Sequence, residues 1–306
     1  MKRAALALLS CSLLPAEPAR PPITGVAHIA FFAKDYAASR AFYRHFLGFQ
    51  EPYSLQNPDG SPSMTFFKVN ERQYIELFPE REAGSDRLSH ISIETDDAET
   101  LRAYLGSKGI KVPDKVGKGR IGNWNFNIRD PEGHTVEIVQ YDPAGWTARE
   151  KGKHLPETRI SLRILHVGLI VTALEREMKF YTEVLGFQET WRGSRSGTEL
   201  SWVNLKVPEG EDYIELMLYK EAPGPAQRGG AHHLALETND IAQSVAALEN
   251  RPYRSQYTRA IEIRTGTNRK RQSNFYDPDG TRTELMEPHT IDGKPTPSST
   301  APPPRP

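Results

Sequence analysis

The pattern of apolar and polar positions changes period along the first part of the chain. Residues 26–32 alternate with a period of two, which predicts a strand with one buried face. Apolar side chains then recur every four residues, which predicts a helix that Asp35 caps and that Gly48 ends in a left-handed conformation. Two further apolar stretches, 63–69 and 74–78, predict a pair of strands. This part of the chain therefore reads βαβββ.

The same order of elements returns directly afterwards. Residues 88–94 alternate as a strand, residues 96–105 have helical spacing, and short strands follow that end with residues 135–141. The chain after residue 160 has the βαβββ order twice more. Four βαβββ units of mixed helix and strand predict an α+β protein.

Short motifs show that the two halves are copies of each other. Phe42-Tyr43 recurs as Phe180-Tyr181, 138 positions later, and both pairs precede the letters LGFQE. The sequence YIEL occurs at residues 74–77 and again at 213–216. DPEGHTVE, which ends at Glu137, returns as DPDGTRTE. Ordered matches of this kind predict two homologous domains, each made of two units.

The predicted boundaries follow from these repeats. The first domain covers 23–142, with units 23–80 and 88–142; a linker covers 143–160; and the second domain covers 161–288, with units 161–220 and 230–288.

Both ends of the chain have a composition unlike the repeats. Residues 1–20 have a basic start followed by a short apolar stretch, which is typical of a signal peptide and predicts export to the periplasm or the extracellular space of a bacterium. Lipoprotein anchoring through Cys11 is an alternative form of the same expectation. Residues 289–306 are rich in Pro, Ser and Thr, which predicts a disordered tail.

Charge and cysteine content narrow the classes of function. Lys+Arg and Asp+Glu are both 39, so the formal net charge is +0 and a general nucleic-acid binder is not expected. The single cysteine excludes an internal disulfide framework and a cysteine-ligated metal cluster. No apolar run is long enough to predict a membrane span, so the expected partner is a small-molecule substrate, and a homodimer is left open.

A histidine and a glutamate recur at matched positions in all four units. Each histidine stands in the first strand of its unit, and each glutamate stands 47 to 51 positions later in the last strand. The pairs are His28 and Glu76, His90 and Glu137, His166 and Glu215, and His233 and Glu284.

These residue types favour a metal site. A lone strand histidine is usually structural, and duplication can copy a residue that has no function. Four matched pairs are harder to explain by packing, because a core has no preference for His and Glu. Two imidazole nitrogens and two carboxylate oxygens suit a borderline divalent ion and leave room for water or substrate. We therefore expect one or two divalent ions, whose identity among Zn, Ni, Mn and Fe stays open.

The motifs resemble those of the vicinal oxygen chelate (VOC) superfamily, which includes glyoxalase I, extradiol dioxygenases and bleomycin resistance proteins. The motifs in question are FYRHFLGF, YIELF and DPEGHTVE in the first half, FYTEVLGF, YIELM and DPDGTRTE in the second, and the four strand histidines. The resemblance covers nearly the whole chain between its two ends. It implies two tandem glyoxalase-like domains with cupped mixed β-sheets.

The ligand set is most similar to that of glyoxalase I. This likeness implies a metal-dependent lyase or isomerase that transfers a proton next to a metal-bound carbonyl of a small molecule. By position, Glu137 or Glu284 would be the catalytic base, while Glu76 and Glu215 would be metal ligands. The expected export argues against glutathione as the substrate.

Two other functions stay open. An extradiol Fe(II) ring-cleavage dioxygenase would use His166, His233 and Glu284 as ligands, although Glu215 adds a ligand that this family lacks. A protein that binds or sequesters a small molecule without catalysis is the alternative of another class.

The sequence also leaves the arrangement of the units and the substrate contacts open. Units one and two could share a metal site, or unit one could pair with unit four, because a linker of this length permits both. Arg264 and Arg269 are candidate substrate-binding residues for a carboxylate or phosphate, and a solvated hairpin tip is the alternative.

Overall fold

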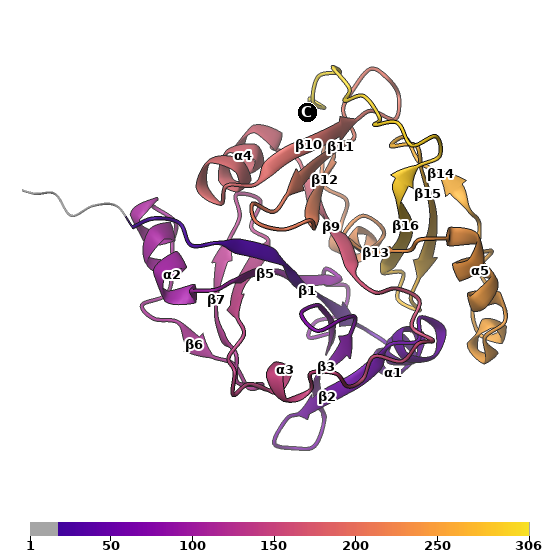
Figure 1. Ribbon diagram of the computed structural model, residues 1–306, viewed down its shortest axis with the longest axis horizontal. Coiled ribbons are helices and arrows are strands. Elements are labelled where there is room, and N and C mark those ends of the chain that lie inside the picture. The colour runs from indigo at the N-terminus through magenta and orange to yellow at the C-terminus, as the bar shows by residue number, and fades with distance from the viewer. Residues whose placement is uncertain (1–17, 306) are drawn as a thin grey trace, which may run out of the picture.

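The computed structural model describes residues 18–305 and contains two eight-stranded sheets, one from each half of the chain (Figure 1). The first half consists of β1 (Ile23–Ala33), α1 (Tyr36–Ala41), the π-helical turn η1 (Phe42–Phe46), β2 (Gln50–Gln56), β3 (Pro62–Lys68), β4 (Tyr74–Pro79), β5 (Leu88–Thr95), α2 (Ala98–Ser107), β6 (Gly117–Lys118), β7 (Trp124–Arg129), β8 (Thr135–Gln140) and the linker helix α3 (Trp146–Arg149). The second half consists of β9 (Ile164–Val171), α4 (Leu174–Met178), the π-helical turn η2 (Lys179–Val184), β10 (Gln188–Gly193), β11 (Trp202–Lys206), β12 (Tyr213–Leu218), the 3₁₀ turn η3 (Pro225–Gly230), β13 (His233–Glu237), α5 (Ile241–Glu249), the 3₁₀ turn η4 (Pro252–Ser255), β14 (Arg264–Thr265), β15 (Lys270–Tyr276) and β16 (Arg282–Thr290).

Each sheet joins two βαβββ units through their first strands. The strand order is β2-β3-β4-β1-β5-β8-β7-β6 in the first sheet and β10-β11-β12-β9-β13-β16-β15-β14 in the second. β1 runs parallel to β4 and antiparallel to β5, and β5 runs parallel to β8. Units one and two therefore share one curled sheet, and units three and four share the other. The α+β class and the tandem arrangement of two curled mixed sheets are confirmed.

The first helix of each half is short and ends in a π-helical turn. Asp35 caps α1 by accepting a hydrogen bond from the backbone N–H of Ala38 at 3.0 Å. Gly48 follows η1 with φ of 81°, and Gly186 follows η2 with φ of 80°. The predicted left-handed stop is therefore present in both halves, because glycine adopts positive φ without a Cβ clash.

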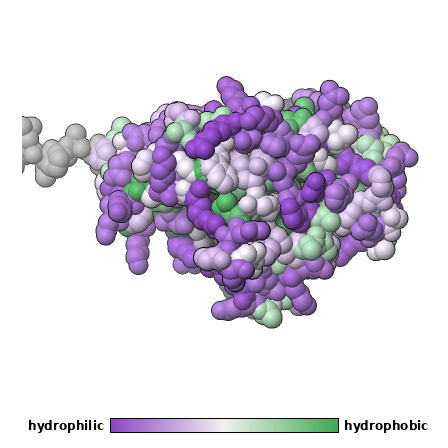
Figure 2. All heavy atoms as spheres, turned by 90° about the horizontal axis from the view of Figure 1, so that it is seen from below, coloured by the Kyte–Doolittle hydropathy of each residue, from purple (hydrophilic) through white to green (hydrophobic). Residues whose placement is uncertain are grey.

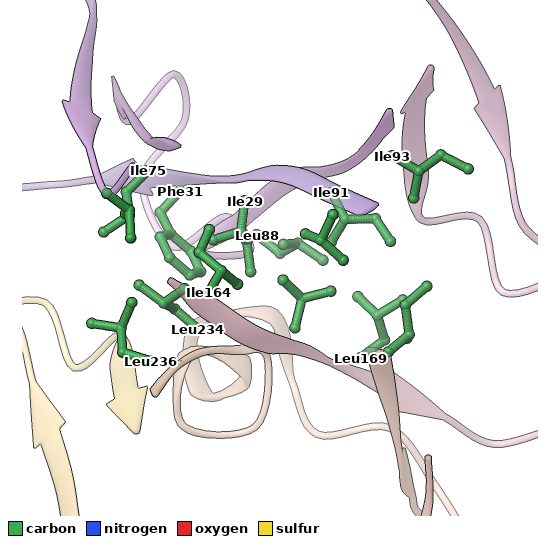
Figure 3. Close-up of a cluster of buried hydrophobic side chains, with 14 of the residues drawn as sticks. Ile29, Phe31, Ile75, Leu88, Ile91, Ile93, Ile164, Leu169, Leu234 and Leu236 are labelled. Atoms are coloured by element: carbon green, nitrogen blue, oxygen red, sulfur yellow. The ribbon is translucent and has the colours of Figure 1, made fainter. Parts of the chain in front are cut away.

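Apolar residues of both halves form one continuous core (Figure 3). Ile29 and Phe31 of β1 and Ile91 of β5 lie against Ile164 of β9 and Leu234 of β13, and all five are fully buried. Because this apolar surface is shared, neither half buries its strands without the other.

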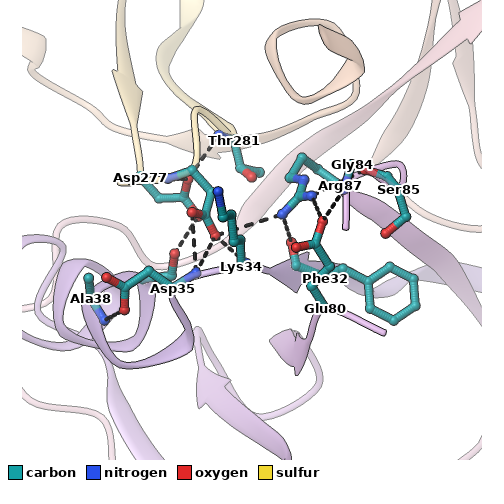
Figure 4. Close-up of polar contacts among 12 residues, drawn as sticks. Phe32, Lys34, Asp35, Ala38, Glu80, Gly84, Ser85, Arg87, Asp277 and Thr281 are labelled. Atoms are coloured by element: carbon teal, nitrogen blue, oxygen red, sulfur yellow. Dashed lines mark hydrogen bonds and ion pairs between the residues drawn. The ribbon is translucent and has the colours of Figure 1, made fainter. Parts of the chain in front are cut away.

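Acidic residues of the two DPxG turns connect the halves across this core, and Figure 4 shows the turn that contains Asp277 beside Lys34 and Asp35. Asp279 in the turn before β16 accepts hydrogen bonds from the backbone N–H groups of Lys34 and Asp35. Glu132 in the turn before β8 accepts hydrogen bonds from the backbone N–H groups of Thr172 at 3.0 Å and Ala173 at 2.7 Å. Each half thus caps the start of the first helix of the other. We call the two turns that contain Glu132 and Asp279 the reciprocal turns.

The residues after β16 lie along the second sheet, although their composition predicts a disordered tail. The Thr296 hydroxyl donates to the Asn268 carbonyl at 2.6 Å, and the Ser299 N–H donates to the Arg192 carbonyl at 2.9 Å. In Figure 1 this yellow segment runs from the β14–β15 side to the β10–β11 side of the sheet. Proline lacks an N–H but keeps its carbonyl, and Pro302 accepts from Leu200 at 2.8 Å.

The face shown in Figure 2 is mainly polar, with apolar residues only in small groups. Among the helices of residues 18–305, none has the length and apolar character needed to cross a membrane. Residues 1–17, which hold most of the predicted signal peptide and Cys11, lie outside the described residues, so export stays a prediction.

Candidate metal centre

Strand register places one predicted glutamate and one predicted histidine of each half on either side of a small residue. In the first sheet Ala30 of β1 pairs with Glu76 on one side and with His90 on the other. In the second sheet Gly168 of β9 pairs in the same way with Glu215 and His233. A Cβ at Gly168 would collide with the His233 ring, so the small residue is what lets the side chains converge above the strand.

The first cluster consists of His28, Glu76, His90 and Glu137. The two histidine Nε2 atoms lie 3.0 Å apart. Nε2 of His28 lies 3.4 Å from a carboxylate oxygen of Glu76 and 3.4 Å from one of Glu137. Nε2 of His90 lies 3.5 Å and 3.1 Å from oxygens of the same two glutamates.

These separations fit a bound divalent ion. Ligand atoms about 2.1 Å from an ion are about 3.0 Å apart at a right angle and about 3.4 Å apart at a tetrahedral angle. Two imidazole nitrogens that face each other at 3.0 Å also suit a shared cation, because each has a lone pair when the ring is neutral. His28, His90 and Glu137 each offer a ligand atom within 4.8 Å of the others.

Burial and mutual attraction shift the ionisation of this cluster. Burial lowers the pKa of His90, but hydrogen bonds and attraction from Glu137 and Glu76 outweigh it and raise the pKa to about 10. Burial raises the pKa of Glu137, but attraction and hydrogen bonds from His28 and His90 outweigh it and hold the pKa well below its usual range. The two carboxylates of this cluster thus stabilise a positive charge between them.

The second cluster consists of His166, Glu215, His233 and Glu284. The two Nε2 atoms lie 2.9 Å apart, and His166 lies 3.4 Å from Glu284. Glu215 is more distant, with one oxygen 3.9 Å from His166 and 3.6 Å from His233. The histidine pair is 0 % exposed, whereas His28 is 5 % exposed and His90 is half-buried.

Arg282 changes the electrostatics of the second cluster. Its Nη2 lies 2.7 Å from Nδ1 of His233. Burial, followed by repulsion from Arg282, lowers the pKa of His233 to about 3. Burial raises the pKa of Glu215. Burial also acts to raise the pKa of Glu284, but hydrogen bonds and attraction from His166, His233 and Arg282 outweigh it and lower that pKa. The two clusters therefore have the same ligand types, but the pKa of His90 is raised whereas the pKa of its counterpart His233 is lowered.

Each cluster adjoins a cavity, and the two cavities differ in lining. The first has a volume of about 190 Å³ and contains both histidines and both glutamates in its wall. Its other side chains are largely apolar or aromatic: Leu55, Met64, Phe66, Tyr74, Phe78, Ile121, Val139 and Tyr141, with Arg120, Asn123 and Asn125 among the polar ones. The second, of about 270 Å³, reaches Glu215 and Glu284 and is lined by Arg195, Arg264, Arg282 and several amides.

The structure brings together all eight predicted ligands, in two groups of four. Of the two predicted substrate-binding arginines, only Arg264 lines a cavity beside a cluster. Arg264 lines the second cavity and bonds to Glu262. Arg269 has φ of 61° and bonds to Asp292 at 2.6 Å. A substrate-binding role for either residue stays a prediction.

Sequence reasoning missed Asn125 and Arg282. Asn125 donates to Oε1 of Glu137 at 2.9 Å and so fixes the orientation of that carboxylate. The position of Arg282, two residues before Glu284, could have been noticed because the other half has Thr135 two residues before Glu137.

The fold and the two clusters define a protein with tandem βαβββ domains, each cupping a His/Glu site suited to a divalent ion. The family model of the Glyoxalase/Bleomycin resistance protein/Dioxygenase superfamily matches residues 25–138 and 163–285. The chain belongs to this superfamily, which confirms the resemblance found in the sequence.

Curated relatives match over parts of the chain. An uncharacterised protein, YaeR of Escherichia coli, is 30% identical over 131 residues, which is 41% of this chain and 95% of that protein. The lactoylglutathione lyase GLX1 of Arabidopsis thaliana is 27% identical over 205 residues, which is 65% of this chain and 66% of that enzyme.

Solved structures share the fold at low sequence identity. The Mn(II)-bound glyoxalase from Novosphingobium aromaticivorans has a TM-score of 0.67 at 20% identity and covers 93% of this chain and 89% of its own. A variant of homoprotocatechuate 2,3-dioxygenase from B. fuscum has a TM-score of 0.67 at 20% identity, with 94% of this chain and 78% of that one covered.

Proposed function

We propose that the protein is a metal-dependent lyase or isomerase of glyoxalase type that moves a proton next to a carbonyl of a small molecule. The observation that carries this proposal is the complete set of two imidazoles and two carboxylates around one point in the wall of the first cavity. The similarity to a lactoylglutathione lyase over 65% of the chain supports the same reaction class.

The residues of the first half have distinct roles in this proposal. His28, His90 and Glu76 would hold the ion, whose contribution when bound is to lower the cost of negative charge that develops on substrate oxygen. Glu137 would take up and return the proton, because it lines the cavity and Asn125 orients its second oxygen.

The cavity lining indicates the kind of substrate. Aromatic and aliphatic side chains on β3, β4 and β8 would exclude water and bind an apolar group, while Asn123 and Arg120 add polar groups at the same wall. A small molecule that combines a carbonyl with a hydrophobic substituent fits this lining.

The test is turnover of a 2-oxoaldehyde thiol adduct by purified protein loaded in turn with Zn, Ni, Mn and Fe(II). Adducts of methylglyoxal and of phenylglyoxal, each with glutathione and with small thiols, would be followed by the ultraviolet absorbance of the thioester. Glu137→Gln should lower kcat by about 10²–10⁴ because a general base is lost.

Glu284→Gln is the matched variant from the second half. A larger loss in Glu284→Gln than in Glu137→Gln would contradict the assignment of the base. No turnover of any adduct with any ion would contradict the reaction class.

One observation favours a second candidate, an extradiol Fe(II) dioxygenase. Each cluster contains two histidines and one glutamate within 4.8 Å of one another, which is the ligand triad of non-haem Fe(II) oxygenases. Uptake of dioxygen with a catechol by the Fe(II)-loaded protein would favour this reaction over proton transfer.

A further inference from the structure

The two clusters differ at one position beside their histidines. Arg282 stands two residues before Glu284, and its strand position pairs with His233. Thr135 stands two residues before Glu137, at the corresponding place in the first half. The copied site therefore has a guanidinium in one half and a hydroxyl in the other.

This guanidinium competes with the contact that His233 would make as a metal ligand. A histidine that binds an ion through Nε2 is neutral and carries its proton on Nδ1, where it needs an acceptor. Nδ1 of His233 lies 2.7 Å from the Ala231 carbonyl, which is such an acceptor, and also 2.7 Å from Nη2 of Arg282, which can only donate. Nδ1 can either donate to the Ala231 carbonyl or accept from Arg282, and the contact with Arg282 needs the tautomer that carries its proton on Nε2, so the two contacts compete for the same nitrogen.

The other histidine of the second cluster, His166, lacks the acceptor on Nδ1 that orients a metal ligand. Nδ1 of His166 is buried and has no hydrogen-bond partner among the described residues. In the first half, Nδ1 of His90 lies 3.1 Å from the Ser89 hydroxyl, which can accept a hydrogen bond from it. His90 corresponds to His233 in the repeat, and both have an acceptor beside Nδ1, so what distinguishes the second half is the donor that Arg282 adds there.

The charge of Arg282 also disfavours a divalent ion in the second cluster. Arg282 lines the cavity together with Glu215 and Glu284, so a fixed positive charge already faces the carboxylates that would neutralise a divalent ion. Within residues 18–305, the arginine that lines the first cavity is Arg120, and its guanidinium is bonded to Ser63 at 2.9 Å and to the Gln56 carbonyl at 2.6 Å. That charge is therefore held away from the first cluster by other partners.

Access separates the two halves further. His28 and His90 form part of the wall of the first cavity, whereas the lining of the second cavity includes the two glutamates and leaves out His166 and His233. A hydrated ion or a substrate can reach four ligand residues in the first half and two in the second.

From these contacts we infer that the first half alone binds the divalent ion, and that Arg282 keeps the second half free of it. The inference deepens the proposed function, since it assigns the ion of that reaction to His28, His90 and Glu76, beside the base Glu137. The second cluster is then a charge-compensated core in which Arg282 takes the place of the cation.

Metal stoichiometry tests this inference without a substrate. The full chain would be equilibrated with Mn(II) alone, and in a parallel series with Zn(II), then freed of excess ion and examined by elemental analysis. We expect about one ion per chain for the unmodified protein and for His166→Ala, and a loss of bound ion in His28→Ala.

The exchange of the two differing residues provides the matched variants. Arg282→Thr should raise the content from about one ion to about two, and Thr135→Arg should reduce it to about none. Arg282→Lys keeps the charge without the planar fork and should stay near one ion. Circular dichroism and the melting temperature would show that each variant is folded before its content is measured.

Several results would overturn the inference. These are two ions in the unmodified protein, an ion that survives His28→Ala and is lost in His166→Ala, and an unchanged content in folded Arg282→Thr. Absence of bound ion from the unmodified protein would overturn it as well. One ion per chain without turnover would instead contradict the proposed reaction and leave the ion assignment supported.

Discussion

At the scale of single residues, the second half contributes a buried carboxyl group to the interface, whereas the first half has a serine at the matching position. Glu177 in α4 is 0 % exposed, and its Oε1 accepts from the Glu132 backbone N–H at 2.8 Å. Ser39 stands at the matching position of α1 and donates to Asp277 at 3.0 Å. Burial, followed by repulsion from Asp130, raises the pKa of Glu177 to about 9.

This raised pKa predicts a pH-dependent cost to stability. An unfolded Glu ionises near pH 4.5, so between that pH and about 9 the folded state holds a proton that the unfolded state has released. The contribution of Glu177 therefore destabilises the fold progressively as pH rises through this window. We expect Glu177→Gln to raise the free energy of unfolding at pH 8 by about 2 kcal/mol and to change it little at pH 4.5.

Urea unfolding at both pH values would measure this difference. Glu175→Gln is the control, because Glu175 is exposed on the same helix and its replacement should have no pH-dependent effect. Equal effects of Glu177→Gln at pH 4.5 and pH 8 would contradict the assignment of a protonated carboxyl.

At the scale of elements, the two copies of one turn have different surroundings. Gly48 and Gly186 both have positive φ after a π-helical turn. A Cβ on Gly48 would lie 2.7 Å from the Thr158 carbonyl, which is backbone, whereas a Cβ on Gly186 would first meet the flexible Arg20 side chain at 3.0 Å.

Alanine at the two glycines should therefore have unequal effects. Both substitutions carry the cost of positive φ for a residue with a Cβ, about 1 kcal/mol. Gly48→Ala adds a clash with backbone, so we expect it to lower the melting temperature by several degrees more than Gly186→Ala. Differential scanning calorimetry of both variants measures this, and a greater loss in Gly186→Ala would show that the linker near Thr158 yields easily.

The elements were largely predictable because their signals are local. Alternation defined β1, β5, β9 and β13, and Asp35 and the two glycines marked the helix ends. The π-helical form of the last turn was not predictable, since it depends on hydrogen bonds from Leu47 to Phe42 and from Phe49 to Tyr43. The eight ligands were predictable from repeated spacing, whereas the contact of Arg282 with His233 needed the strand register.

At the scale of the whole molecule, the two halves are packed into one unit. Their apolar strands share a core, and the reciprocal turns connect them on both sides. Neither feature has a local signal, because each depends on which surfaces meet after both sheets have formed. For the same reason the sequence left open how the four units pair.

The reciprocal turns predict that damage to one turn lowers the stability of both halves together. Asp279→Ala removes the acceptor for two backbone N–H groups and a charge near Arg87, which should cost about 1–3 kcal/mol. We expect a single calorimetric transition at a lower temperature. Asp59→Ala, at an exposed loop, is the control and should have almost no effect, and a second separate transition in Asp279→Ala would show that the halves unfold independently.

The reciprocal turns also bear on how such a chain arose. A contact in which each side presents the same turn to the same helix start is self-complementary, as in a twofold dimer of identical subunits. Fusion of two ancestral copies through residues 143–160 would preserve that pairing. In a fused chain the two cavities no longer have to be identical. Each copy can then change by itself, and the two halves now have Thr135 and Arg282 at matched positions.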